Sequence, residues 1–291
     1  MERPAGEQSL VKLSWCVCPT DTVYVSNRTS ASLPTYGGEE EPYVTASASD
    51  ILSSLVVSRS IGTSTALRIL ALGDSITYGF NEKPSNSYRK FLQCSLSTSG
   101  VPATYIGTTT SGDWTNNAVD GYVGQTIDQI GVSVSWILTQ TPPPNLVLLH
   151  AGSNDILHSV DVSTAPERLG ALIDKVITAT GSSVLVAQII KLGEGYTEFN
   201  ALVDTYNAAI PAIVATRVAA GKNVAVVDMS GQVSADDLID GIHPIAAGYR
   251  KMAAAWFAGL DELSISNVTG AFEDLGASAL PSSGNCADLV A

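Results

Sequence analysis

The chain has 291 residues, 45% of them hydrophobic, which suffices for one sizeable core and excludes a chain that is disordered throughout. Its formal net charge of −13 repels phosphate backbones and anionic lipids, so we expect neither nucleic acid nor a membrane as partner. Neutral esters, as small molecules or on polysaccharides, remain open as substrates. No stretch has the roughly 20 consecutive apolar residues of a membrane span.

Residues 1–65 are rich in Ser, Thr, Gly and Glu and show little periodicity, which predicts an irregular N-terminal extension. No signal peptide is visible, because the first 25 residues lack a basic start followed by an apolar run. Two glycosylation sequons, at Asn27 and Asn267, nevertheless favour secretion. We therefore expect an extracellular protein.

The cysteines give little guidance on pairing. Cys16 and Cys18 are too close together to bridge each other, and Cys94 and Cys286 lie far along the chain. A bridge from one N-terminal cysteine to Cys286 is one pairing that the sequence allows, and the pairing as a whole stays open. No further Cys or His stands at the short spacing of a metal site, so we expect no metal.

From residue 67 onward, short apolar runs alternate with helical patterns. The runs predict buried strands at 67–72, 103–106, 146–150, 184–190 and 224–227. The helical patterns cover 87–96, 126–138, a segment starting at 164, 198–220 and 245–260. Thr164 and Glu167 form a capping-box signature, and Pro211 predicts a kink. The alternation predicts an α/β domain over 66–263, with a parallel sheet covered on both faces, followed by a tail or linker at 264–291.

In such sheets the active site lies beyond the carboxyl ends of the strands. One polar cluster comes directly after the first predicted strand, and a second lies between the second strand and the next helix. In the first, a strand-to-helix turn exposes Ser75 near helix N-terminal amides; alternatively, Ser75 is a plain helix cap and Asp74 a turn residue. The second, 120–124, ends in Gly124, which can bring its backbone N–H close to a ligand or be an ordinary loop glycine.

Two further clusters follow later strands. The side-chain amide of Asn154 can donate to an oxyanion, or it can belong to an Asn-Asp turn. Asp240 stands three residues before His243, so its carboxylate can fold back to the imidazole; the alternative is a surface His beside an Asp. His150 ends an apolar run and reads as a core residue, and His158 as a solvated one.

Together the clusters resemble a known family. GDSIT at 73–77, Gly124, GSND at 152–155 and DGIHP at 240–244 resemble blocks I, II, III and V of the SGNH (GDSL-type) hydrolase superfamily. Segments 121–130 and 243–253 are similar to carbohydrate esterase family 3, the acetyl xylan esterase type. The resemblance covers about 67–260 and implies a flavodoxin-like three-layer α/β/α sandwich with a five-stranded parallel sheet. Ile245 departs from the Asn frequent there, and 1–65 match nothing recognised.

The resemblance implies a serine esterase that forms an acyl-enzyme. Ser75 would be the nucleophile, His243 its base and Asp240 the residue that orients the base. The Ser75 and Gly124 backbone N–H groups and the Asn154 side chain would form the oxyanion hole, with Asp74 and Asp155 in supporting positions. The implied substrate is an O-acetyl group on a carbohydrate such as xylan, and the mechanism needs no cofactor.

Other functions stay open at this point. A lipase, thioesterase or lysophospholipase could use the same scaffold, and a non-catalytic carbohydrate-binding protein could retain the fold. Trp114 and Tyr122 flank the second cluster and could stack on a sugar face, although such aromatic residues more often simply pack. Nothing in the sequence predicts the oligomeric state.

Overall fold

The computed structural model describes residues 66–265 and Cys286. The predicted N-terminal extension, Cys16 and Cys18, both sequons and nearly all of the tail lie outside the described residues, and those expectations remain predictions.

The described residues form a seven-stranded sheet. Its order is β3-β4-β1-β5-β6-β7, with β2 also paired to β1. The strands are β1 (Leu67–Gly73), β2 (Ala103–Ile106), β3 (Thr109–Thr110), β4 (Ala118–Gly121), β5 (Leu146–His150), β6 (Ser183–Gln188) and β7 (Val224–Asp228). All pairs are parallel except β3 with β4. The predicted α/β class with a mostly parallel sheet is confirmed.

The sheet exceeds the predicted five strands by β3 and β4. These strands show no apolar run, since β3 is a pair of exposed threonines and β4 contains Asp120 and Gly121. The second polar cluster, placed by the sequence between the second predicted strand and a helix, therefore begins inside a further strand. β4 pairs with the carboxyl end of β1, placing Asp120 beside Leu72 and Gly121 beside Gly73. This register brings the start of the second cluster next to the first.

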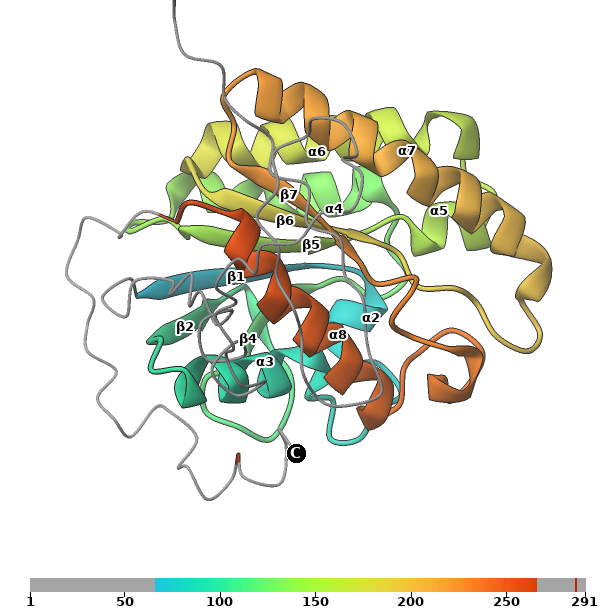
Figure 1. Ribbon diagram of the computed structural model, residues 1–291, viewed down its shortest axis with the longest axis horizontal. Coiled ribbons are helices and arrows are strands. Elements are labelled where there is room, and N and C mark those ends of the chain that lie inside the picture. Colours follow the sequence, from blue (N-terminus) through green and yellow to red (C-terminus); the bar gives the residue numbers. More distant parts are fainter. Residues whose placement is uncertain (1–65, 266–285, 287–291) are drawn as a thin grey trace, which may run out of the picture. The chain divides into compact units, whose positions relative to one another are not determined.

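Helices cover both faces of the sheet, with α3 and α8 on one side and α4, α6 and α7 on the other (Figure 1). The helices are α2 (Ser75–Tyr78), α3 (Ser87–Thr98), α4 (Ile127–Ser133), α5 (Ser153–Leu157), α6 (Ala165–Thr180), α7 (Asn200–Ala219) and α8 (Ala246–Gly259). Short 3₁₀ turns are η1 (Val134–Thr139), η2 (Val162–Thr164), η3 (Thr197–Phe199), η4 (Ala235–Asp237) and η5 (Leu260–Glu262).

Two hydrophobic clusters, one on each face of the sheet, hold these layers together. Strand β1 shows why both exist, because Ile69 and Ala71 join the cluster under α3 and α8 whereas Leu70 and Leu72 join the other. Successive side chains of a strand point to opposite faces, so a run of buried residues is what a doubly covered strand requires. Burial of β1 on both sides fixes the position of the turn that follows it.

Two local predictions about the helices need comment. The predicted capping box at Thr164 is wrong, because its hydroxyl donates to the Asp161 carbonyl 3.0 Å away. A capping box forms instead at the start of α4, where Gln129 Oε1 accepts the Thr126 N–H at 2.9 Å. Pro211 lies inside α7, and the kink predicted there stays a prediction.

A disulfide joins Cys94 of α3 to Cys286, which corrects the suggested pairing of Cys286 with an N-terminal cysteine. The partners are 192 residues apart, and Cys94 is fully buried. Spacing along the chain carries no signal for such a pair, because the fold and not the sequence brings it together.

Candidate active site

The nucleophile candidate stands where β1 turns into α2. Asp74, and not Ser75, caps this helix, since its Oδ1 accepts the Ile76 N–H at 3.0 Å. The alternative in which Ser75 is a plain cap is therefore wrong. A left-handed Gly79 ends the helix after one turn. The Ser75 hydroxyl is left to face another part of the chain.

That part is the turn that carries Asp240 and His243. Ser75 Oγ lies 2.9 Å from His243 Nε2, across 168 residues. On the other side of the ring, His243 Nδ1 lies 2.8 Å from Asp240 Oδ2. The structure thus brings hydroxyl, imidazole and carboxylate into one hydrogen-bonded line, the arrangement that activates serine nucleophiles.

Backbone contacts fix the turn in place. Gly241 has a φ of 79°, and a Cβ there would lie 2.2 Å from the Glu194 carbonyl oxygen. The Gly193 N–H donates to the Gly241 carbonyl at 2.7 Å, and the Ile239 N–H donates to the His243 carbonyl at 2.8 Å. A glycine is therefore required at 241, between the acid and the imidazole.

The Asp240 carboxylate is held in its charged form. Burial alone would raise its pKa, but the backbone N–H of His243, the imidazole and the Asn81 amide outweigh burial and lower the pKa below its usual value. Oδ1 accepts the N–H groups of Ile242 and His243 at 3.0 and 2.8 Å. At neutral pH this carboxylate can stabilise an imidazolium.

Two residues that the sequence did not single out also contact this group. The Phe80 ring packs against the His243 ring, with centroids 5.1 Å apart. The Asn81 side-chain amide donates to Asp240 Oδ2 at 2.6 Å. They come three and four residues after the GDSIT block, and that proximity was the one signal that could have drawn attention to them.

Two of the expected oxyanion donors lie side by side, Gly124 on a loop and Asn154 at the start of α5. Gly124 has a φ of 76°, and no atom lies within 4 Å of where a Cβ would stand, so its side of the loop is open. Asn154 Nδ2 donates to the Gln125 carbonyl at 2.9 Å, which joins the start of α5 to the Gly124 loop. A side-chain amide has a second hydrogen, and this one can serve a substrate oxygen.

Asp155 connects three helices. Its Oδ2 accepts the Ile127 N–H of α4 at 3.0 Å, and its Oδ1 pairs with Arg168 of α6. Burial raises its pKa, although these donors oppose the rise. Asp155 therefore anchors α5, and with it Asn154, to the scaffold.

Asp74 has a second contact behind the nucleophile. His150 Nδ1 lies 3.8 Å from Asp74 Oδ1, and both side chains are fully buried. Burial would raise the Asp74 pKa, but the neighbouring His150 side chain and the hydrogen bond from the Ile76 N–H outweigh burial and lower it. His150 is a buried residue as predicted, and His158 is exposed at the end of α5.

The prediction that Trp114 stacks on a sugar is wrong. Its side chain is only 7% exposed, and its ring packs edge-on against Tyr105 in the core with centroids 5.5 Å apart. Tyr122 is half-buried against the second hydrophobic cluster, and burial beside Asp120 raises its pKa to about 12. Its predicted role stays a prediction.

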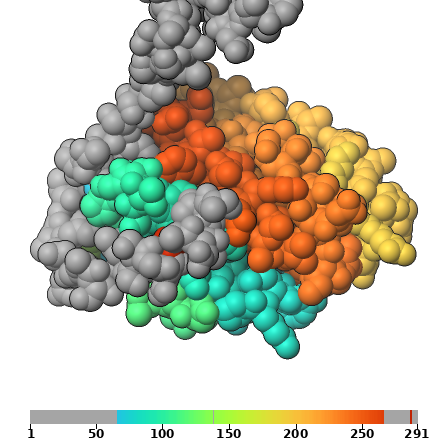
Figure 2. Space-filling view, turned by 60° about the horizontal axis from the view of Figure 1, so that its bottom comes forward, coloured from blue at the N-terminus to red at the C-terminus, as the bar shows by residue number. Residues whose placement is uncertain are grey.

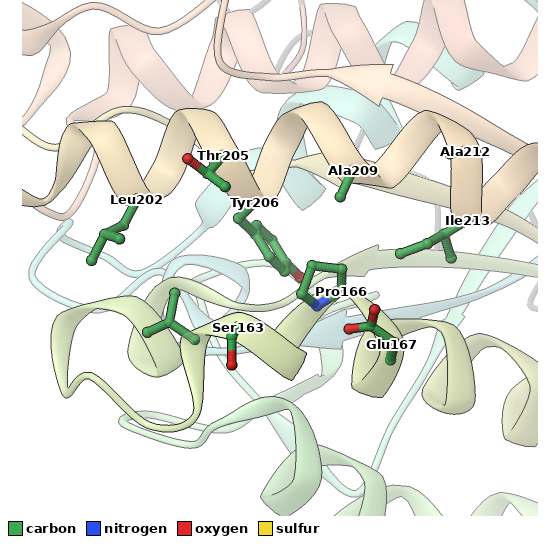
Figure 3. A pocket seen from close by; sticks show the side chains of 10 residues that line it. Ser163, Pro166, Glu167, Leu202, Thr205, Tyr206, Ala209, Ala212 and Ile213 are labelled. Atoms are coloured by element: carbon green, nitrogen blue, oxygen red, sulfur yellow. The ribbon is translucent and has the colours of Figure 1, made fainter.

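A groove of about 630 Å³ lies elsewhere, between the start of α6 and α7 (Figure 3). Its lining is largely apolar, with Pro166, Leu202 and Ile213 among its residues, and it contains none of the candidate catalytic side chains. Tyr206 lines it and donates from its hydroxyl to the Ala151 carbonyl at 2.8 Å. The groove therefore backs onto the third block but is not where the hydroxyl and imidazole meet.

Within the described part of the chain, no helix is both long enough and apolar enough to span a bilayer. No cluster of three or more His, Cys, Asp or Glu side chains there could hold a metal ion.

Several known proteins are similar to this chain in sequence or in fold. A multidomain esterase from Ruminococcus flavefaciens is 28% identical over 218 residues, which cover 65% of this chain and 28% of the relative, so the chain spans less than a third of that protein. A Clostridium thermocellum family 3 carbohydrate esterase superposes with a TM-score of 0.60 at 29% identity, covering 67% of this chain and 96% of its own.

A family 3 carbohydrate esterase from Talaromyces cellulolyticus superposes with a TM-score of 0.55 at 19% identity, covering 67% of this chain and 96% of its own, and this likeness concerns the fold alone. The predicted resemblance to GDSL-type hydrolases and to carbohydrate esterase family 3 is thus confirmed. The model of the GDSL-like lipase/acylhydrolase family matches residues 71–251, more than half of the chain, and the chain therefore belongs to that family.

Proposed function

We propose that the protein hydrolyses carboxylic esters through an acyl-enzyme on Ser75. The observation that carries this proposal is the 2.9 Å separation of Ser75 Oγ and His243 Nε2, with Asp240 behind the ring. As Oγ attacks the ester carbonyl, its proton passes to Nε2 and the carbonyl oxygen takes the π electrons. The tetrahedral adduct collapses, and the alcohol leaves with the proton from Nε2.

Water completes the cycle by the same steps. It attacks the acyl carbonyl, His243 takes its proton, and collapse returns that proton to Ser75 Oγ and releases the acid. The negative oxygen of each adduct would be held by the backbone N–H groups of Ser75 and Gly124 and by the Asn154 amide. The Asn154 bond to the Gln125 carbonyl supports this role, because it sets the amide beside the Gly124 loop.

The substrate we propose is an O-acetyl group on a carbohydrate. The similarity to a family 3 carbohydrate esterase over 96% of that enzyme's chain supports this class. The net charge of −13 favours neutral substrates over anionic ones.

A second candidate, an esterase acting on longer acyl chains, is favoured by one observation. Three large apolar side chains that neighbour the site in sequence are exposed: Phe80 by 39%, Val123 by 48% and Ile239 by 55%. Exposed apolar surface beside a reacting centre can hold an acyl chain.

We further propose that the protein acts outside the cytoplasm. The Cys94–Cys286 disulfide supports this location, because reducing compartments seldom keep such bonds.

Acetate release from acetylated xylan, measured beside a chain-length series of nitrophenyl esters, tests the proposal. We expect release of acetate and a preference for the acetyl ester, and Ser75→Ala should lose on the order of 10⁶-fold in kcat with its fold intact. A preference for long chains would instead favour the second candidate. Wild-type turnover by purified Ser75→Ala would refute the serine mechanism.

A further inference from the structure

Asn81, on the loop between α2 and α3, reaches the acid of the proposed triad. Its side-chain amide donates to Asp240 Oδ2 at 2.6 Å, and the same oxygen faces His243 Nδ1 at 2.8 Å. In Figure 2 the teal surface of the chain that follows α2 meets the orange surface of the chain that precedes α8. Two donors from distant parts of the sequence therefore share one carboxylate oxygen.

The other donors to this carboxylate come from its own turn. Oδ1 accepts the backbone N–H groups of Ile242 and His243, and Oδ2 accepts the imidazole. Within the described residues, Asn81 is thus the one hydrogen-bond donor to Asp240 from outside the turn. It ties the acid to the loop that follows the nucleophile.

The loop that carries Asn81 is firmly held. Arg89 is fully buried and donates to the Tyr78 and Ser85 carbonyls on either side of it. Glu82 is buried and accepts two backbone N–H groups at the start of α3. Asn81 itself has a φ of 62°, in the left-handed region that asparagine tolerates better than most residues. The amide is therefore set in place before any substrate binds.

We propose that Asn81 is a positioning residue, whose amide fixes the Asp240 carboxylate so that Oδ2 stays directed at the imidazole while His243 carries the proton of Ser75. The inference rests on the proposed function. Without Asn81, the carboxylate is held only at Oδ1, by two backbone N–H groups, so Oδ2 can turn away from Nδ1. Such a turn would weaken its stabilisation of the imidazolium formed in the transition state.

The groups packed around His243 and Asp240 determine how a new charge at position 81 should affect the pKa of the imidazole. Ser75 and Phe80 contact the imidazole, the Glu194 carbonyl and the Tyr196 ring lie behind Gly241, and the nearby Asp237 carboxylate is paired with Lys251. A negative charge placed at position 81 would favour the protonated imidazole, so a higher pH would be needed to produce the neutral base.

Two variants of the full chain test the role, measured with nitrophenyl acetate across pH 5–9. Asn81→Gly keeps the left-handed backbone and removes the amide, and we expect kcat to fall roughly tenfold with little change in KM. Asn81→Asp should move the acid limb of kcat/KM upward by about one pH unit. Ser159→Gly, at an exposed position with a φ of 53°, is the matched control and should behave as wild type.

Proton NMR gives a second readout. The low-field resonance of His243 Nδ1–H should shift or broaden in Asn81→Gly. If the wild type hydrolyses the ester while both variants keep its kcat and acid limb, the inference is wrong and the proposed function stands. The inference is also wrong if the variants lose thermal stability but retain the wild-type acid limb and resonance. A wild type without any esterase activity refutes both.

Discussion

Replacing Asp240 by Asn should lower kcat by about 10⁴-fold, because the change reverses the imidazole tautomer. In the structure Oδ1 accepts two backbone N–H groups, and Oδ2 accepts the imidazole and the Asn81 amide. An amide has one oxygen, and the two backbone N–H groups hold it at the Oδ1 position because they can only donate, whereas the Asn81 amide can flip to present its own oxygen. The NH₂ group then points at Nδ1 and forces the ring proton onto Nε2, where it faces Ser75 Oγ and blocks proton abstraction.

The assay is steady-state hydrolysis of nitrophenyl acetate, with KM expected to change little because Asp240 lies behind the ring. Asp174→Asn is the matched control, since Asp174 is half-exposed and pairs with Arg217 through Oδ2 at 2.6 Å on the outer helices. It should retain wild-type turnover. An Asp240→Asn variant within tenfold of wild type would show that the carboxylate does not set the tautomer.

Three other variants probe the scaffold and the oxyanion site. Asn154→Ala should cost about 10²–10³ in kcat in the same assay, by removing an oxyanion donor; an unchanged kcat would exclude that role. Cys94→Ser, which breaks the bridge to Cys286, should lower the free energy of unfolding by about 2–5 kcal/mol in urea titrations, whereas equal midpoints would contradict a stabilising bridge. Arg89→Met should lower it by roughly 3–5 kcal/mol, because Arg89 donates to five backbone carbonyls; a loss under 1 kcal/mol would refute this role.

The sequence could place Ser75, Asn154 and the Asp240–His243 pair at one edge of the sheet for a simple reason. Ser75 and Asn154 follow buried strands, and parallel strands bring their carboxyl ends to the same edge. Only two residues separate Asp240 from His243 in the turn, which leaves few other ways for the carboxylate to point. Pattern and topology together therefore predicted much of the candidate site.

What the sequence could not reveal depends on contacts between distant segments. Asn81 belongs to no motif, and its contact with Asp240 spans 159 residues. Strand β4 hides a buried Asp120, whose carboxylate accepts the Trp136 indole N–H at 2.6 Å, so the apolar signal of a strand is missing there. Trp114 lies in a polar loop sequence yet packs inward, which local composition cannot show.

Labelling with a fluorophosphonate, followed by peptide mapping, tests most directly whether the hydroxyl at 75 is activated by the imidazole at 243. We predict a single adduct on the peptide that contains Ser75, formed at least 100-fold more slowly in His243→Ala. Modification of a different residue, or equal labelling rates in the two proteins, would contradict the account.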